Sequence, residues 1–332
     1  MEVIPGIHQL RLPIPGSSLG VINAYLVRGE DGYLLVDTGW DAKDSFASLQ
    51  QQLAELGVQL TDIKTILVTH IHPDHYGLAG RIKRLSGAEI VIHQMETSFI
   101  ESRYHNWEGL IAQVAAWLRI NGMPEQDLDR IARASLNLLD YVHLVYPDRT
   151  LSGGEIIEVG GFRFEVIWTP GHASGHICLY EPHKRVLLSG DHVLPGITPI
   201  VTLHLQNIGN PLADYVTALK AVSRLDVDIV LPAHEQIFYD LPKRVDEILC
   251  HHDVRMEHML QAIGDTPRTA YEIARSIPWR AAVHDWNDLL DWEKKATIFE
   301  TLAHLELMNG MKRIEKICRR GVVYYGPSSR SL

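Results

Sequence analysis

One short segment, Thr69-His70-Ile71-His72-Pro73-Asp74-His75, constrains this chain more than any other. It follows the apolar run at residues 63–68, which predicts a buried strand. Three imidazoles and a carboxylate in one loop can face one small volume, and these groups bind zinc and its first-row neighbours. Solvated loop histidines would explain any one of these residues, but the four together favour a metal site. We therefore expect this loop at the carboxyl end of a strand, where open α/β sheets hold ligands.

Three more residues with metal-binding side chains stand directly after predicted strands. They are His172 after residues 161–168, Asp191 after residues 186–189, and His234 after residues 229–231. Each alone is explained equally well as a turn residue. Their repeated position at a strand end favours one site shared with the segment at residues 70–75.

Residues 1–240 alternate between short strand-like runs and helical segments. Strands are predicted at residues 7–11, 24–28, 33–36, 63–68, 161–168, 177–180, 186–189 and 229–231, and helices at residues 41–56 and 212–224. Asp41 is suited to cap the first of these helices, and Gly57 to end it. This order predicts an α/β fold in which helices face the sheets.

Residues 95–145 interrupt this pattern with apolar residues at helical spacing, which predicts a helical insertion. The insertion carries Phe99, Tyr104, Trp107 and Trp117. A lid over the metal site, packing within a helical core and a homodimer contact are three open explanations for these aromatic residues.

The pattern changes near residue 241. Helices are predicted at residues 245–264, 269–277 and 295–309, and two short strands at residues 313–317 and 321–325. Three helices followed by a two-stranded ribbon are typical of a winged helix-turn-helix. We therefore expect a catalytic domain at residues 1–240, which contains the insertion, and a small winged-helix domain at residues 241–332.

Five motifs in order along the chain carry a family resemblance. They are Val36-Asp37-Thr38-Gly39, the HxHxDH segment at residues 70–75, Gly171-His172, Gly190-Asp191 and Ala233-His234. Over residues 1–240 the chain resembles the metallo-β-lactamase superfamily. The resemblance implies a four-layer αββα sandwich with two metal ions at the rim of the sheets.

The resemblance also implies a role for each ligand. The first metal would bind His70, His72 and His172; the second would bind Asp74, His75 and His234; and Asp191 would bridge them. Asp37 would orient the ligand loop without binding metal. We expect two divalent ions, with zinc favoured and manganese or iron as alternatives. His176 is expected to be a buried, hydrogen-bonded ring and not a ligand.

Comparison within the superfamily narrows the chemistry. Diiron oxygen reductases of this fold usually carry Glu where this chain has His72, so redox chemistry is disfavoured. Zinc β-lactamases commonly replace or lack one second-metal ligand, whereas Asp74 and His75 are both present here. The pattern is closer to the glyoxalase II, lactonase and nuclease branches. The runs at residues 190–195 and 251–255 resemble hydrolases that append a winged-helix domain to the lactamase core.

The expected function is hydrolysis of a small ester, thioester or lactone. Two divalent ions can lower the pKa of a shared water and create a hydroxide nucleophile, and Asp74 would orient it and shuttle a proton. An endoribonuclease or phosphodiesterase is an alternative, supported by the basic residues Lys312, Arg313, Lys316, Arg319 and Arg320. A β-lactamase-like side activity and a non-enzymatic, metal-stabilised scaffold are further alternatives.

Composition bounds the partners. The net charge of −10 argues against a surface built wholly to bind nucleic acid, so RNA is a weaker expectation than a small-molecule substrate. The three cysteines form no CxxC pair, which favours a reducing cytoplasm. No window approaches the roughly 20 apolar residues needed to span a bilayer, so no membrane association is expected.

Overall fold

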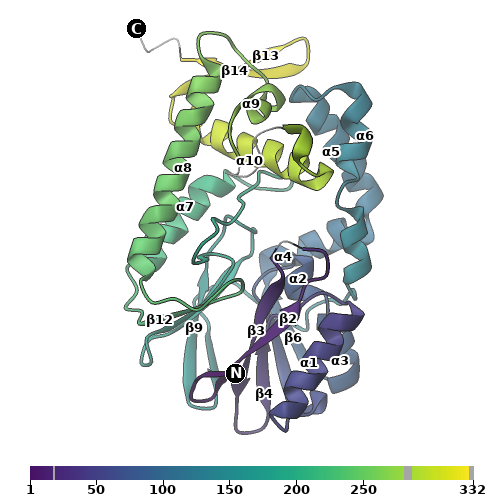
Figure 1. Cartoon of the computed structure of the whole chain (residues 1–332), viewed down its shortest axis with the longest axis vertical. Coiled ribbons are helices and arrows are strands. Elements are labelled where there is room, and N and C mark those ends of the chain that lie inside the picture. The colour runs from purple at the N-terminus through teal and green to yellow at the C-terminus, as the bar shows by residue number, and fades with distance from the viewer. Residues whose placement is uncertain (18, 280–285, 329–332) are drawn as a thin grey trace. The chain divides into compact units, whose positions relative to one another are not determined.

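The computed structural model describes residues 1–17, 19–279 and 286–328. Its helices and sheets (Figure 1) confirm the predicted α/β class. The chain groups into two compact units. The sheet unit consists of residues 1–105, 137–199 and 218–245, and the helical unit consists of residues 106–136, 200–217 and 246–332. The expected domain boundary at residues 240 and 241 stays a prediction.

The sheet unit contains a seven-stranded first sheet. Its strands, in spatial order, are β1 (Glu2–Ile4), β2 (Ile7–Pro13), β3 (Val21–Arg28), β4 (Tyr33–Val36), β5 (Ile63–Val68), β6 (Glu89–His93) and β7 (Arg149–Leu151). Pairing is antiparallel from β1 to β4 and parallel from β4 to β7. Val36 is paired with Leu67, so β4 and β5 end at the same edge. The residues that follow them, Asp37 and Thr69, therefore start from neighbouring positions.

The second sheet has five strands. Their spatial order is β12 (Ile229–Pro232), β11 (Val186–Gly190), β10 (Ile177–Glu181), β9 (Phe162–Trp168) and β8 (Ile156–Val159). Only the pair formed by β11 and β12 is parallel, and Gly190 is paired with Pro232. The carboxyl ends of these two strands thus bring Asp191 and His234 to one edge.

The two sheets share an apolar core, and the first sheet is buried on both faces. Leu34, Val36 and Leu67 belong to the cluster that also holds second-sheet residues. Leu35 and Ile66, which point the other way, pack in the cluster under the helices. Strands buried on both faces carry apolar residues on both, which is why β4 is an uninterrupted hydrophobic segment and β5 ends in an apolar run at residues 66–68.

Helices α1 (Lys43–Glu55) and α3 (Ala79–Ser86) cover the outer face of the first sheet (Figure 1). Helix α1 buries Phe46, Leu49 and Leu53 at helical spacing. The expected cap at Asp41 is wrong: the N-cap position is Ala42, and Asp41 instead accepts a hydrogen bond from Arg81 at 3.0 Å.

Shorter helices lie close to the loop that follows β5. They are α2 (Pro73–Tyr76), α4 (Gln94–Ile100) and the π-helical turn η2 (Glu101–His105). Gly77 ends α2 at a crowded point, because a Cβ there would lie 2.4 Å from the carbonyl oxygen of Tyr141. Only glycine allows so close a backbone approach.

The helical unit has a core of its own. Its main elements are α5 (Trp107–Ile120), α6 (Leu128–Ala132), α9 (Ala270–Ser276), α10 (Asp291–Gly310), and the ribbon of β13 (Ile314–Arg319) and β14 (Val322–Pro327). Two helices, α7 (Pro211–Val222) and α8 (Leu241–Ile263), have residues in both units. One apolar cluster joins α5 and α6 with α8, α9 and α10. The predicted order of three helices and a ribbon is present, and the winged-helix arrangement stays a prediction.

Packing explains two of the aromatic residues in the predicted insertion. Trp107 and Trp117 pack against the helical core, and the ring of Trp117 lies 4.9 Å from that of Phe299.

Among the described helices, none is both long and apolar enough to cross a membrane.

Candidate metal centre

The seven predicted ligands come together in three overlapping groups. The groups are His70, His72 and His172; Asp74, His75 and His234; and His70, His75 and Asp191. Within each group, the possible ligand atoms lie within 4.8 Å of one another. Residues up to 164 positions apart thus converge because each follows a strand or begins a short helix at one edge of the two sheets.

The first group consists of three imidazoles. Nδ1 of His72 lies 2.8 Å from Nε2 of His70 and 3.0 Å from Nε2 of His172. His72 is the N-cap residue of α2, and Pro73 occupies the first turn. Proline favours that helix start and holds the preceding residue in an extended conformation, so the backbone directs His72 away from the helix.

The second group combines a carboxylate with two imidazoles. Oδ2 of Asp74 lies 3.3 Å from Nε2 of His234 and 3.9 Å from Nε2 of His75. Nδ1 of His234 faces the carbonyl oxygen of Val21 at 3.1 Å, which leaves Nε2 to face the carboxylates.

Asp191 lies between the two groups. Its Oδ2 is 3.4 Å from Nε2 of His172 and 3.5 Å from Nε2 of His75. Its Oδ1 is 3.4 Å from Nε2 of His234. One carboxylate therefore faces imidazoles of both groups, which is the geometry required of a bridging ligand.

The donor set fits divalent cations. Among the described residues, Nε2 of His75, Nε2 of His234 and Oδ1 of Asp191 are buried atoms with no hydrogen-bond partner. Leaving such an atom unpaired costs about 1–3 kcal/mol, and these three face one volume. A cation bound there would satisfy all three at once. Imidazole and carboxylate ligands without thiolate suit zinc, manganese and iron alike.

The carboxylates make this volume favourable for positive charge. Burial alone would lower the pKa of His75, but Asp37, Asp191 and Asp74 outweigh it and raise that pKa well above its usual value. Burial alone would also lower the pKa of His234, but Asp191 and Asp74 outweigh it and raise that pKa to about 9.

The first group has the opposite character. Burial, followed by the neighbouring His75, lowers the pKa of His70 well below its usual value. Burial, His172 and the positive charge of Arg103 do the same to the pKa of His72. Both rings are therefore neutral at pH 7, which is the form that binds metal ions.

Asp37 lies behind the second group. Its Oδ1 accepts a hydrogen bond from the backbone N–H of Thr69 at 2.8 Å, and its Oδ2 lies 2.7 Å from Nδ1 of His75. It is 2% exposed and adopts a positive φ of 61°. The carboxylate thus fixes the orientation of the His75 ring, as expected for a residue that supports a ligand.

The expected burial and hydrogen bonding of the His176 ring are confirmed. Its ring is fully buried, with Nδ1 2.8 Å from Oγ1 of Thr169, and Nε2 accepts a hydrogen bond from the backbone N–H of Asp191 at 3.0 Å. A Cβ on Gly190 would lie 2.6 Å from Nε2 of His176. The glycine before Asp191 therefore makes room for the ring that holds the Asp191 backbone.

Sequence reasoning missed Glu96 beside the first group, and it gave Tyr104 only as one of the aromatic residues of the insertion. Glu96 accepts hydrogen bonds from the backbone N–H groups of Ile71 and Gly175, and Tyr104 donates one to the carbonyl oxygen of Ile71. Neither stands in a motif, and Glu96 follows β6, a strand that the sequence did not predict. Both act through tertiary contacts with residues at least 25 positions away, so no local pattern identifies them.

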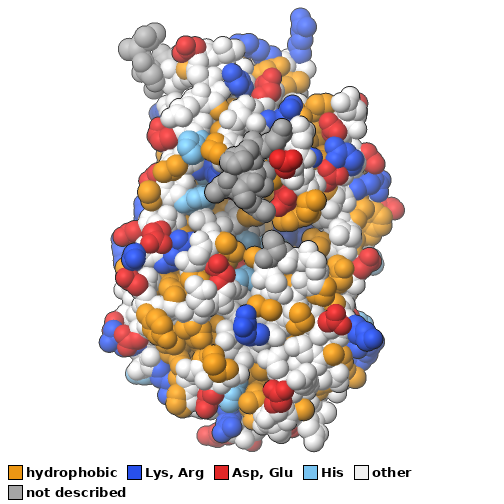
Figure 2. All heavy atoms as spheres, in the orientation of Figure 1, with side chains coloured by type: hydrophobic (Ala, Val, Ile, Leu, Met, Phe, Trp, Pro, Cys, Tyr) orange, Lys and Arg blue, Asp and Glu red, His pale blue; other side chains and the backbone are white. Residues whose placement is uncertain are grey.

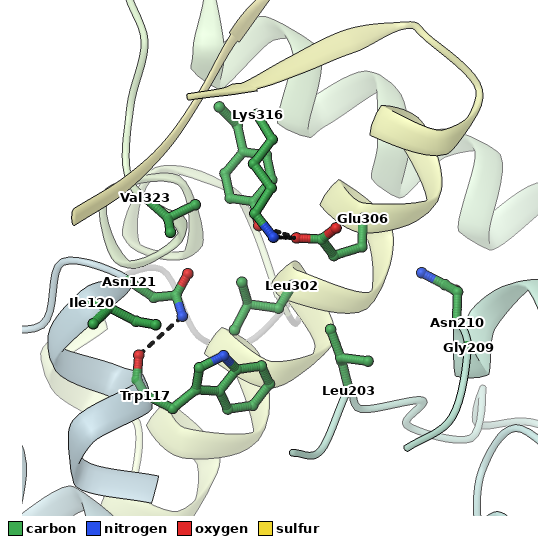
Figure 3. A pocket seen from close by; sticks show the side chains of 11 residues that line it. Trp117, Ile120, Asn121, Leu203, Gly209, Asn210, Leu302, Glu306, Lys316 and Val323 are labelled. Atoms are coloured by element: carbon green, nitrogen blue, oxygen red, sulfur yellow. Dashed lines mark hydrogen bonds and ion pairs between the residues drawn. The ribbon is translucent and has the colours of Figure 1, made fainter. Parts of the chain in front are cut away.

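A separate cavity of about 330 Å³ lies in the helical unit (Figure 3). Trp117 and Leu302 form apolar walls, while Lys316 and Glu306 are paired at 2.6 Å across its polar side. Every residue that lines it belongs to the helical unit, so it contains none of the predicted metal ligands.

Comparison with known proteins identifies relatives of this chain. The sequence model described as the metallo-beta-lactamase superfamily matches residues 18–234. A probable metallo-hydrolase of Bacillus subtilis, YqjP, is 25% identical over 97% of this chain and 98% of its own. The acyl-coenzyme A thioesterase MBLAC2 of Gallus gallus is 27% identical over 65% of this chain and 73% of its own.

Solved structures extend the likeness to nearly the whole chain. The metallo-beta-lactamase family protein TTHA1429 of Thermus thermophilus is 31% identical with a TM-score of 0.81, covering 98% of this chain and 100% of its own. A beta-lactamase domain protein of Burkholderia ambifaria is 27% identical with a TM-score of 0.78, covering 98% of this chain and 94% of its own.

Proposed function

This chain belongs to the metallo-β-lactamase superfamily, and from that premise we propose that it hydrolyses a small ester, thioester or lactone. The observation that carries the proposal is the convergence of seven imidazole and carboxylate side chains on one volume. Two divalent cations, with zinc favoured, would be held by His70, His72, Asp74, His75, His172, Asp191 and His234. Bound at such a site, they supply an activated water and polarise the oxygen of the scissile group.

Asp74 is the proposed catalytic residue among these side chains. Its side chain is 16% exposed, compared with 10% for Asp191, so it is the more accessible of the two carboxylates. Burial would raise its pKa, but His75 and His234 outweigh this and lower the pKa of Asp74 to about 2. The ionised carboxylate can accept a hydrogen bond from the attacking water and orient it towards the substrate.

Two observations support a small substrate. The net charge of −10 disfavours a long polyanion such as a nucleic acid, and one relative, which matches 65% of this chain, is named an acyl-coenzyme A thioesterase. Thioesters, esters and lactones share a carbonyl carbon that water can attack. The choice among them is part of the proposal, as is the identity of the metal.

Metal removal combined with a substrate panel tests the proposal. We expect the chelated protein to lose more than about 100-fold of its rate on at least one ester, thioester or lactone, because the cations supply several kcal/mol of transition-state stabilisation. Adding back zinc, manganese or iron(II) should restore the rate. An unchanged rate in protein whose metal content has been measured as near zero would refute it.

Phosphodiester hydrolysis on RNA is the second candidate, favoured by the order of α8, α9, α10 and the ribbon β13–β14. Of the five basic residues between positions 312 and 320 that would bind RNA, two form ion pairs within the protein. Lys316 lies 2.6 Å from Glu306, and Arg313 lies 2.5 Å from Glu257. Figure 2 shows Lys and Arg side chains interspersed with Asp and Glu on the face in view. We expect no binding of a fluorescent RNA at low salt. Tight binding that falls steeply as salt rises would favour the nuclease instead.

A further inference from the structure

A buried carboxylate outside the predicted ligand set connects two ligand loops. Oε2 of Glu96 accepts a hydrogen bond from the backbone N–H of Ile71 at 3.0 Å, and Oε1 accepts one from the backbone N–H of Gly175 at 2.6 Å. Glu96 is 1% exposed. Ile71 lies between His70 and His72, and Gly175 lies three residues after His172. The carboxylate thus bridges the two segments that carry the first ligand group.

Gly175 is shaped for this contact. A Cβ at that position would lie 2.6 Å from Cγ of Glu96 and 3.0 Å from its Oε1. The 2.6 Å distance is shorter than real Cβ contacts allow, so a side chain there would displace Glu96. Glycine is therefore required by the close approach of Glu96.

A second connection holds the same loop from its other side. Nε1 of Trp168 donates a hydrogen bond to the carbonyl oxygen of Ser174 at 2.9 Å. The Trp168 ring stacks on His93 with a centroid separation of 5.3 Å and an interplanar angle of 10°. His93 is the N-cap residue of α4, the helix that carries Glu96. The His172 loop is therefore attached to both the start and the first turn of α4.

We propose that Glu96 is a positioning residue for the first cation, because it ties the His70–His72 loop to the His172 loop so that the three imidazoles remain close. The inference rests on the proposed metal-dependent function. A charged carboxylate makes stronger hydrogen bonds than a neutral acceptor, and two backbone donors use both of its oxygens. Without it, the second-sheet loop bearing His172 loses a buried link to the first-sheet loop.

The structure assigns a separate carboxylate to each half of the site. Asp37 accepts a hydrogen bond from Thr69 and lies 2.7 Å from Nδ1 of His75, a member of the second group, whereas Glu96 accepts hydrogen bonds from the backbone N–H groups of Ile71 and Gly175, beside His70, His72 and His172. Loss of Glu96 should therefore weaken the binding of one cation and leave the binding of the other unchanged.

The test measures metal affinity by competition with a chromophoric chelator. In Glu96→Gln the side chain keeps its size but presents an amide N–H₂ to one of the two backbone N–H groups. We expect two cations to bind the unaltered protein, and one of them to bind Glu96→Gln about 10–100-fold more weakly, as is typical when a ligand-supporting contact is removed. Glu101→Gln, an exposed change that affects only a contact with Tyr146, should leave both affinities unchanged.

A double-mutant cycle identifies the weakened site. In a His172→Ala background the first group is already broken, so adding Glu96→Gln should change the remaining affinity by less than about twofold. Gly175→Ala disturbs the same pair of hydrogen bonds with the Glu96 carboxylate intact, and it should reproduce the selective loss of affinity for one cation. It also serves if Glu96→Gln does not fold.

Two results would overturn the inference. One is an equal loss of affinity for both cations in the folded variants Glu96→Gln and Gly175→Ala; the other is unchanged affinity for both cations in these two variants. Failure of the proposed function would look different, because the unaltered protein itself would then bind no pair of divalent cations.

Discussion

Asp74→Ala is expected to lower kcat by about 10³-fold, within the range that positioned acid–base groups contribute. The carboxylate lies 3.3 Å from His234 and retains 16% exposure, so it can contact both the second ligand group and a water in the site. Alanine removes the acceptor that orients the attacking water and one of the second group's donors. The measurement is kcat on the best substrate from the panel, with metal content determined on the same sample.

Asp44→Ala is the matched control for this change. Asp44 is an exposed aspartate in the first turn of α1, and its replacement should leave kcat unchanged. If Asp74→Ala binds two cations and retains kcat within about tenfold of the unaltered protein, Asp74 has no such role.

His172→Ala is the second large-effect change, and we expect activity to fall by about 10³-fold or more. The ring places Nε2 3.0 Å from His72 and 3.4 Å from Asp191, so it contacts the first group and the carboxylate between the groups. Its loss leaves His70 and His72 as the only imidazoles there. Losing the several kcal/mol that a polarising cation supplies corresponds to a rate change of this size.

Free imidazole provides a specific readout for His172→Ala. Added imidazole can enter the vacated space and should restore part of both cation affinity and rate. His183→Ala, which changes an exposed histidine in the turn between β10 and β11, should behave like the unaltered protein. Full activity of His172→Ala with an undiminished metal content would remove His172 from the ligand set.

The α/β class could be predicted, and the proposed ligands could be located near strand ends, because both depend on local sequence. β4, β5, β11 and β12 are mainly apolar; β4, β5 and β11 end directly before Asp37, Thr69 and Asp191, and β12 ends two residues before His234. Parallel pairing of β4 with β5 and of β11 with β12 then brings those ends together. Bringing Asp37 of the first sheet close to Asp191 and His234 of the second also requires the two sheets to pack on each other, which strand pairing alone does not predict.

The strands β6, β7 and β8 were not predicted from the sequence. β7 has three residues, two of them exposed, and forms because β6 offers a parallel edge. β8 alternates weakly and is defined by its pairing with β9. Such short strands depend on their neighbours more than on their own residues.

Glu96 could not be predicted for a related reason. Its neighbours in sequence, Met95 and Thr97, carry no imidazole or carboxylate, and its two hydrogen-bond donors lie 25 and 79 residues away. A buried glutamate on a short helix has no sequence signature until the loops it contacts are placed.

The shared core of the helical unit limits which fragments of this protein can fold on their own. Helices α5 and α6 precede residue 240, yet Ile111 and Leu118 of α5 and Ile131 of α6 are buried in one cluster with residues of α8, α9 and α10. A fragment ending at residue 240 would expose these side chains to water, and we expect it to aggregate when expressed alone. Limited proteolysis between residues 136 and 200 should correspondingly yield pieces that remain associated until denaturant is added.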